Sequence, residues 1–248
     1  MNHTQDITPQ QTLNAQLQSL TPARVGLGRY GAAVPTAARL ELLSAHAQAR
    51  DAVHSHMDMT LLREQLGEIL EIHSQAKDRR EYLLRPDYGR APRELPPELA
   101  DYKADIGIVL IDGLSPAAVS THGPQLYTAL KETLKDYKVA PPVVGHQGRV
   151  ALGDHIGQAA AWDITLVVIG ERPGLSVPSS LGIYSTWKTY AGITEERRNC
   201  ISNIHPPEGM SYHDAALIAL DYVEKYYQAG QSGFMIKAKE IAPQLEQK

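Results

Sequence analysis

The sequence lacks most features of secreted and membrane-bound proteins. Its 248 residues include one cysteine, Cys200, so no disulfide can form within the chain, and this suits a reducing compartment. No uninterrupted apolar run approaches the roughly 20 residues that a membrane-spanning helix needs. The start, "MNHTQDITPQQ", has no basic stretch followed by an apolar run, as a secretion signal would. We therefore expect a cytoplasmic protein with no membrane partner.

The chain also lacks an excess of positive charge. Its 24 Lys and Arg residues are outnumbered by 28 Asp and Glu residues, which gives a net charge of −4. This balance argues against nucleic acid as the main partner. Aromatic residues are uneven, with 12 Tyr, two Trp and one Phe. Because a tyrosine hydroxyl needs a hydrogen-bond partner, many of these side chains should lie at boundaries or interfaces.

Several motifs of common active sites are missing. There is no paired C-x-x-C, no H-E-x-x-H and no G-x-x-x-x-G-K-[ST]. His54 and His56 point about 200° apart on a helix and cannot share an ion, so we predict no metal site. The stretch "GLGRYG" (26–31) matches G-x-G-x-x-G, but neither a clear strand nor a βαβ unit surrounds it. We interpret it as a turn.

Composition divides the chain into three regions. Residues 1–21 form a polar, Gln-rich, flexible head in which Leu13, Leu17 and Leu20 share one helical face. This head is either a cap on the body or a targeting segment that becomes helical in a partner's groove. Residues 22–100 read as a helical region and linker, with helices over 35–57 and 60–80. Four prolines within 85–103 mark the junction to the region 101–248.

The region 101–248 alternates between strand and helix patterns. Apolar runs at 106–112, 141–147 and 164–170 predict buried strands, and "CISNI" (200–204) predicts a short one. Predicted helices at 123–137 and 150–161 separate the first three strands, and a helix capped by Ser211 closes the chain. The predicted fold is α/β, a Rossmann-like parallel sheet domain preceded by an N-terminal helical segment.

Polar or Gly-rich residues follow three of these strands, at Asp112, His146 and Glu171. The carboxyl ends of parallel strands lie along one edge, so these turns should line one crevice. The alternative is that these residues only form the ordinary turns between helices and strands. In "VVIGERPGLSVPSS" (167–180), prolines restrict the loop that Glu171 begins, as in an ordered ligand loop. Cys200 is either a thiol activated by nearby Arg and His residues or a packing residue.

Four segments together resemble the light (small) chain of ethanolamine ammonia-lyase. They are "RVGLGRYGAAVPTAARLELLSAHAQARDAV" (24–53), "QGRVALGDHIG" (147–157), "VVIGERPGLSVPSSLGIY" (167–184) and "RRNCISNIHPPEG" (197–209). The similarity extends from about Ala23 to Lys237. It implies a subunit of an enzyme that converts ethanolamine to acetaldehyde and ammonia with adenosylcobalamin.

The resemblance also implies a division of labour. A barrel-shaped heavy chain holds the substrate and the radical chemistry, and the light chain covers the other side of the corrin. Matching positions make Val150, Glu171 and Cys200 the cofactor contacts, with no catalytic residue in this chain. The family's role implies a bacterial cytoplasmic location, within a protein-shelled microcompartment to which residues 1–21 could target the enzyme. A stand-alone nucleotide-dependent enzyme on a Rossmann-like sheet is the alternative.

Overall fold

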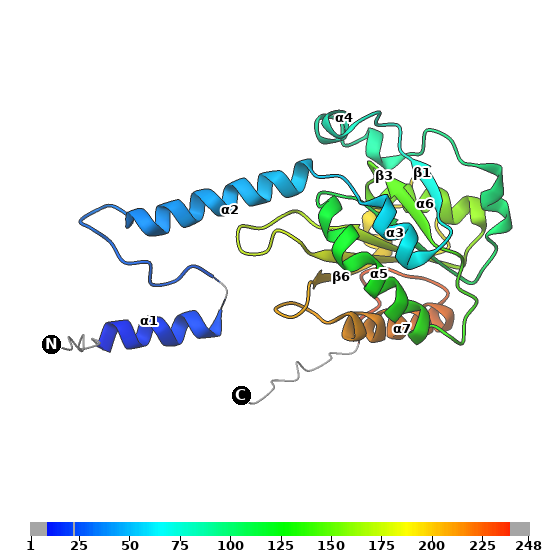
Figure 1. Cartoon of the computed structure of the whole chain (residues 1–248). Coiled ribbons are helices and arrows are strands. Elements are labelled where there is room, and N and C mark those ends of the chain that lie inside the picture. The colour runs from blue at the N-terminus through cyan, green and yellow to red at the C-terminus, as the bar shows by residue number, and fades with distance from the viewer. Residues whose placement is uncertain (1–8, 22, 239–248) are drawn as a thin grey trace.

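A computed structural model describes residues 9–21 and 23–238 (Figure 1). Helices and strands follow one another as α1 Pro9–Leu20, α2 Thr36–His54, α3 Met59–Leu66, β1 Leu70–His73, α4 Arg79–Leu84, η1 Tyr88–Arg90, η2 Pro97–Asp101, β2 Ile106–Ile111, α5 Pro116–Thr133, β3 Val143–His146, α6 Val150–Ala160, β4 Ile164–Gly170, β5 Leu181–Trp187, η3 Glu195–Arg197, β6 Arg198–Ile204 and α7 Tyr212–Ala229. Within the part that the structure describes, every helix is too short or too polar to cross a bilayer.

The strands form one six-stranded sheet in the order β1-β3-β2-β4-β5-β6. The strands β1, β3, β2 and β4 run parallel, whereas β5 pairs antiparallel with both β4 and β6. The prediction of an α/β fold is thus confirmed, but the Rossmann-like parallel sheet is not, because the sheet is mixed. The physical reason is the connection: loop 171–180 holds no helix, and a chain that returns without a crossover must pair antiparallel.

Strand β1 replaces part of a predicted helix. A continuous helix over 60–80 was expected, but α3 ends at Leu66, where Gly67 adopts φ of 80° and donates its N–H to the Arg63 carbonyl. Such a positive φ suits glycine and ends a helix. The next residues pair with β3, and Ile72 is buried against the sheet's core. The prediction of one helix over 60–80 is therefore confirmed for its first part, α3, and wrong for the residues that form β1.

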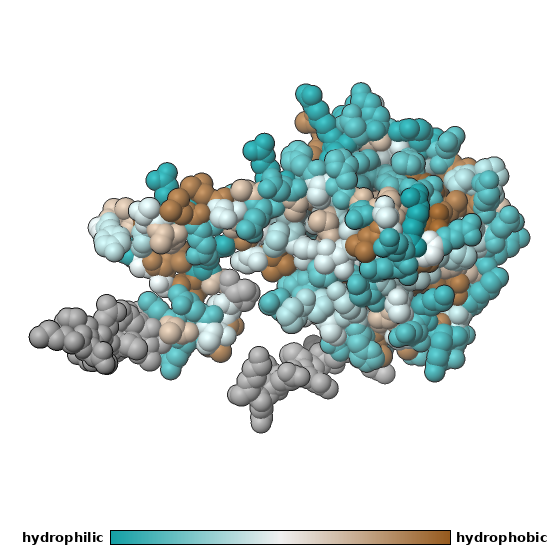
Figure 2. All heavy atoms as spheres, viewed as in Figure 1, coloured by the Kyte–Doolittle hydropathy of each residue, from teal (hydrophilic) through white to brown (hydrophobic). Residues whose placement is uncertain are grey.

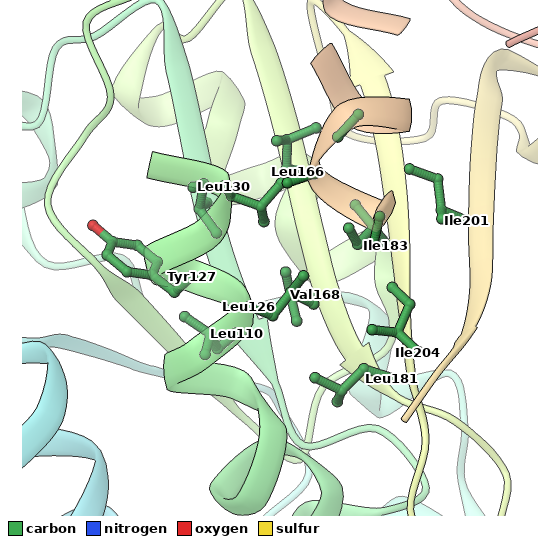
Figure 3. Close-up of a cluster of buried hydrophobic side chains, with 14 of the residues drawn as sticks. Leu110, Leu126, Tyr127, Leu130, Leu166, Val168, Leu181, Ile183, Ile201 and Ile204 are labelled. Carbon is green, nitrogen blue, oxygen red and sulfur yellow. The ribbon is translucent and has the colours of Figure 1, made fainter. Parts of the chain in front are cut away.

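Alternating side chains of the central strands fill two apolar cores, one on each face. On one face, Ile108 and Leu110 of β2 join Leu166 and Val168 of β4 under α5 and α7. Figure 3 shows this cluster, with Leu126 and Leu130 of α5 pointing onto the strands. On the other face, Val109 and Ile111 pack against α6. Because successive side chains of a strand point to opposite faces of the sheet, neighbouring residues belong to different cores.

Two helix boundaries show how neighbours complete a helix end. Helix α5 begins at Pro116 rather than near residue 123, because Ser55 Oγ accepts the otherwise unpaired N–H of Ala117 at 3.2 Å. Helix α7 begins as predicted, with Ser211 Oγ accepting the Asp214 N–H at 3.0 Å.

Helices α1 and α2 project from the sheet domain as an arm, residues 9–54 (Figure 1). Apolar side chains are exposed along it, and Figure 2 shows several of them gathered on α2. The exposed leucines of the arm include Leu13, Leu17 and Leu20 on α1 and Leu40 and Leu43 on α2. Arg24 ties the arm to the body, since its guanidinium donates to the Leu175 carbonyl at 3.1 Å. A monomer gains nothing from such exposure, which is typical of protein interfaces.

Candidate functional site

An open cleft lies at the carboxyl ends of the parallel strands. It measures about 420 Å³ and receives residues from the segments that follow β2, β3 and β4. These include Leu114, Val150 and Glu171, while Tyr82 of α4 and Tyr184 of β5 complete the wall. The expectation that three strand ends meet at one crevice is thus confirmed for these segments. The edge of an open α/β sheet is where such folds bind ligands.

Asp112 is a buried residue directly before the cleft residues Gly113 and Leu114. Its carboxylate is 2% exposed and accepts the N–H groups of Gln147 and Gly148 at 2.7 and 2.9 Å. Burial raises the pKa of Asp112 to about 6, although the Gly148 N–H and the Arg79 guanidinium at 3.7 Å favour the charged form. Arg79 also donates to the Gly113 carbonyl at 2.8 Å. These contacts fix the shape of two cleft loops.

Tyr82 lies between two guanidinium groups. The Cζ atoms of Arg79 and Arg149 are each 4.8 Å from its ring centre, and its hydroxyl donates to the Gly148 carbonyl at 3.1 Å. Burial raises the pKa of Tyr82 to about 12. Arg149 lines the cleft, and its buried Nε has no hydrogen-bond partner. This side of the cleft is therefore cationic and suited to an anion or a strong acceptor.

Val150 is the first residue of α6, directly after the positioned loop. The Arg149 N–H donates to the Gly89 carbonyl at 2.7 Å, which holds the start of the helix. Val150 reaches the cleft as a partly exposed apolar side chain. It can therefore provide apolar contact to a ligand at the cleft.

Glu171 is held in place at the exit of β4. Its Oε2 accepts the Ser180 hydroxyl at 2.7 Å, and the Asn203 N–H lies 3.4 Å from both carboxylate oxygens. A Cβ atom at Gly182 would stand 2.9 Å from Oε1, so glycine leaves the room that the carboxylate occupies. Carboxylate oxygens accept more than one hydrogen bond, so Glu171 can still bind a donor.

Cys200 of β6 lies beside a cleft residue of the neighbouring strand β5. It pairs in register with Tyr184, which lines the cleft, and the two side chains share a hydrogen bond. Although the side chain is exposed, desolvation by its surroundings raises the pKa of the Cys200 thiol, with Glu171 acting in the same direction. The nearest arginine in sequence, Arg198, is bound to Asp154 instead. These observations speak against an activated nucleophile.

Val150 and Glu171 thus line one cleft, and Cys200 lies beside its wall residue Tyr184 without lining the cleft itself, whereas other predicted residues lie elsewhere. His146 lies on the other side of β3, where its Nε2 is 2.8 Å from a Glu71 carboxylate oxygen. Burial, followed by the neighbouring His73, lowers the pKa of His146. Arg172 is exposed at the cleft, and the structure gives it no ion pair with Glu171 among the residues it describes.

Sequence reasoning missed three cleft residues. Tyr82 and Arg149 meet only through tertiary structure, and Tyr184 belongs to a strand that was not predicted. The excess of tyrosine over phenylalanine was a usable signal, because it predicted tyrosines at boundaries. The stretch 26–31 is exposed and lies between α1 and α2. It is a connection rather than a dinucleotide-binding βα turn, as expected.

Comparison with known proteins shows the family of this chain. The family model for ethanolamine ammonia-lyase light chain (EutC) matches residues 11–237. The chain belongs to this family. Its relatives include the ethanolamine ammonia-lyase small subunit of Rhodococcus erythropolis, 45% identical over 94% of this chain and 93% of the relative. The small subunit of Pseudomonas fluorescens strain Pf0-1 is 43% identical, covering 93% and 89%. That of Rhodopseudomonas palustris strain BisA53 is 46% identical, covering 81% and 80%.

Membership of the ethanolamine ammonia-lyase light-chain family covers nearly all of the described residues. The matched range includes the arm from residue 11, the sheet domain and the whole cleft. The family name implies a lyase, and a small subunit implies a heavy-chain partner. The stand-alone nucleotide-dependent enzyme is not favoured.

Proposed function

We propose that this chain is the cofactor-holding subunit of an adenosylcobalamin-dependent ethanolamine ammonia-lyase, which converts ethanolamine to acetaldehyde and ammonia. In this proposal the light chain binds one side of the cofactor, and the heavy chain carries the substrate and the chemistry. The observation that carries the proposal is that Val150 and Glu171 line one cleft at the carboxyl edge of the sheet, with Cys200 paired to the cleft residue Tyr184.

The size of the cleft supports a shared cofactor site. At about 420 Å³ it lies in the lower half of the range for pockets that enclose a drug-sized molecule. Adenosylcobalamin is far larger than such a molecule, so this cleft can hold only an edge of it. The rest of the cofactor would require a second surface, which the heavy chain would provide. Exposed Leu40 and Leu43 on α2 are consistent with a large protein partner.

The chemical character of the lining residues also fits cobalamin. The cofactor has an apolar corrin face, amide side chains around its rim and a nucleotide tail with a phosphate. Val150 would contact the apolar part, and the Glu171 carboxylate would accept a hydrogen bond from an amide or a hydroxyl. Arg149, with its unpaired Nε, would lie toward the phosphate. Pro173 and Pro178 restrict the loop after Glu171, so less entropy is lost on binding.

This chain's residues would bind and orient the cofactor rather than react. When bound, adenosylcobalamin supplies the radical chemistry of the deamination. A thiol donates hydrogen readily to carbon radicals, so Cys200 should lie at the rim or lower face, away from the adenosyl group. Its raised pKa keeps it protonated and unreactive as a nucleophile at neutral pH.

The experiment is reconstitution from separate chains. The light chain alone, and the heavy chain with adenosylcobalamin alone, should show no deamination of ethanolamine, and the three together should restore it. Deamination by the isolated light chain would overturn the proposed division of labour. A thermal shift of the light chain with NAD or ATP, but no response of either chain to cobalamin, would favour a nucleotide enzyme instead.

We also propose a location for the assembled enzyme. Ethanolamine breakdown often takes place inside protein-shelled bacterial microcompartments in the cytoplasm. Residues 1–21, with Leu13, Leu17 and Leu20 exposed on α1, would then dock on a shell protein. Residues 1–8 lie outside the described residues, so the support comes from α1.

A further inference from the structure

Three side chains with metal-binding atoms converge at the carboxyl ends of β1 and β3, outside the cleft. His73 of β1 pairs in register with His146 of β3, so their side chains leave the same face of the sheet next to each other. Glu71 lies two residues before His73 and therefore on that same face. The parallel pairing of two short strands is what brings the three residues together.

The side chains are also close in space. The two imidazole rings stack with centres 4.5 Å apart and planes 13° from parallel. His146 Nε2 is 2.8 Å from a Glu71 carboxylate oxygen. One ligand atom from each residue can be chosen so that all three lie within 4.8 Å of one another. The structure thus presents two nitrogens and one oxygen to a common point.

The backbone beneath this cluster is fixed on both strands. The Ser74 N–H donates to the His146 carbonyl at 3.1 Å, and the Arg93 N–H donates to the His73 carbonyl at 2.9 Å. Side chains on such a framework can adjust while their Cα atoms stay in place. His73 is exposed, so rotation of its ring meets little resistance.

The surroundings leave room for an ion and a water molecule. Glu71 and His73, though not His146, line an opening of about 300 Å³ together with Arg93, Glu94 and Leu95. Arg63 forms an ion pair with Glu71, and because it is more than half exposed it can be displaced by a competing cation. The Glu94 carboxylate at the opening favours a cation, and Arg93 and Arg63 oppose one.

We propose that Glu71, His73 and His146 form a binding site for a divalent transition-metal ion, with Zn²⁺ as the best-fitting case. In a tetrahedral zinc site, bonds of about 2.0–2.2 Å place the ligand atoms about 3.3–3.5 Å apart. To reach that spacing, the exposed His73 ring has to turn inward, and the hydrogen-bonded His146 Nε2 and Glu71 oxygen, now 2.8 Å apart, have to separate. Two imidazoles and one carboxylate leave a fourth position for water, which faces the opening. Imidazole ligands favour Zn²⁺, Ni²⁺ or Cu²⁺ over Mg²⁺ and Ca²⁺.

The test uses the full-length light chain, stripped of metal with a chelator and then dialysed. Calorimetric titration with ZnCl₂ should give one tight equivalent, and MgCl₂ should give none. The variants His73→Asn and Glu71→Gln should each weaken Zn²⁺ binding at least tenfold. His213→Asn, which changes an exposed histidine on α7, should bind as the wild type does. Cys200→Ser serves as a second control because a thiol can also bind zinc.

A second measurement separates binding from folding. Zn²⁺ should raise the melting temperature of the wild type and of His213→Asn, but not that of His73→Asn or Glu71→Gln. Both altered residues are at least partly exposed, so circular dichroism should show folded variants. Absence of Zn²⁺ binding by the wild type would overturn the site and leave a hydrogen-bonded cluster without an ion. Equal losses in His213→Asn and His73→Asn would overturn it as well.

Discussion

The guanidinium of Arg198 on β6 binds the carboxylate of Asp154 on α6 through two parallel hydrogen bonds. The Nη1–Oδ1 and Nη2–Oδ2 distances are 2.5 and 2.7 Å, and both side chains are 2% exposed. Val150 lies one helical turn before Asp154, and Cys200 lies two residues after Arg198. This buried pair therefore fixes the two elements that carry two of the proposed cofactor contacts relative to each other.

Replacing Asp154 by Asn should destabilise the protein strongly. The change removes the buried counter-charge of Arg198 and leaves it only the largely exposed Glu195 carboxylate, 2.8 Å from its Nε. Breaking a buried ion pair typically costs about 3–5 kcal/mol. Urea unfolding of wild type and variant would measure the loss. The control is Asp87→Asn at the exposed Arg85–Asp87 pair, which should leave the midpoint nearly unchanged. Equal effects of the two substitutions would contradict the importance of burial.

Asp112→Asn should change how stability depends on pH. Burial raises the pKa of Asp112 to about 6, above its ordinary value of 3.8, so the folded state binds the proton more tightly than the unfolded state. The wild type therefore loses unfolding free energy as pH rises from about 4 to about 6, by up to about 3 kcal/mol from this group. Asn does not titrate. The stability deficit of the variant should shrink across this window in urea titrations at several pH values, and parallel profiles would contradict the assignment.

Glu171→Gln should weaken cofactor binding in the assembled enzyme. Loss of a charged acceptor costs about 1.5–3 kcal/mol, so the cobalamin dissociation constant should rise about 10- to 150-fold in an absorbance titration. Glu224→Gln, at an exposed position on α7, is the matched control. An unchanged dissociation constant for Glu171→Gln would remove this carboxylate from the site.

Cys200 should react slowly with iodoacetamide near neutral pH. Desolvation raises the pKa of its thiol, so at a given pH less of it is thiolate than in a free cysteine. The alkylation rate of Cys200 should begin to rise at a higher pH than the alkylation rate of a small free thiol. Bound cobalamin together with the heavy chain should protect the thiol from alkylation. Rapid labelling at neutral pH would mean that the thiol is activated after all.

Deleting residues 1–21 should change where the enzyme is located without changing its turnover. The truncated chain, assembled with the heavy chain, should keep its ethanolamine deamination rate but lose association with microcompartment shells in a co-sedimentation assay. A variant with Leu13, Leu17 and Leu20 changed to Ala should behave in the same way. Loss of turnover in both would instead assign the head a structural role.

Much of the fold could be predicted because its signals are local. The runs of β2 and β4 are fully buried, and only strands covered on both faces read as unbroken apolar stretches. Strand β1 was missed because its four residues continue the apolar spacing of α3, and pairing with β3 decides its conformation. Strand β5 is buried except at Tyr184 and Trp187. No helix stands between β4 and β5, and for this reason β5 runs antiparallel to β4.

Residues of the candidate site could be predicted only where the local sequence around them is distinctive. Glu171, at an apolar run's exit and before two prolines, stands out in the sequence. Contacts such as Tyr82 with Arg149, or His73 with His146, join residues 67 and 73 positions apart and depend on tertiary structure. Missing β1 also hid the histidine pair, since their register exists only once β1 is placed beside β3.

Arg79 contacts three parts of the molecule at once. Its Nε donates to the Val53 carbonyl in α2 at 2.7 Å, its Nη1 holds the loop after β2, and its guanidinium lies against Tyr82. Binding of a partner that displaces α2 would move this guanidinium and, with it, the loops of the proposed cofactor cleft. In the proposed two-subunit enzyme, assembly and cofactor binding would then be coupled, and each would change the free energy of the other by the same amount.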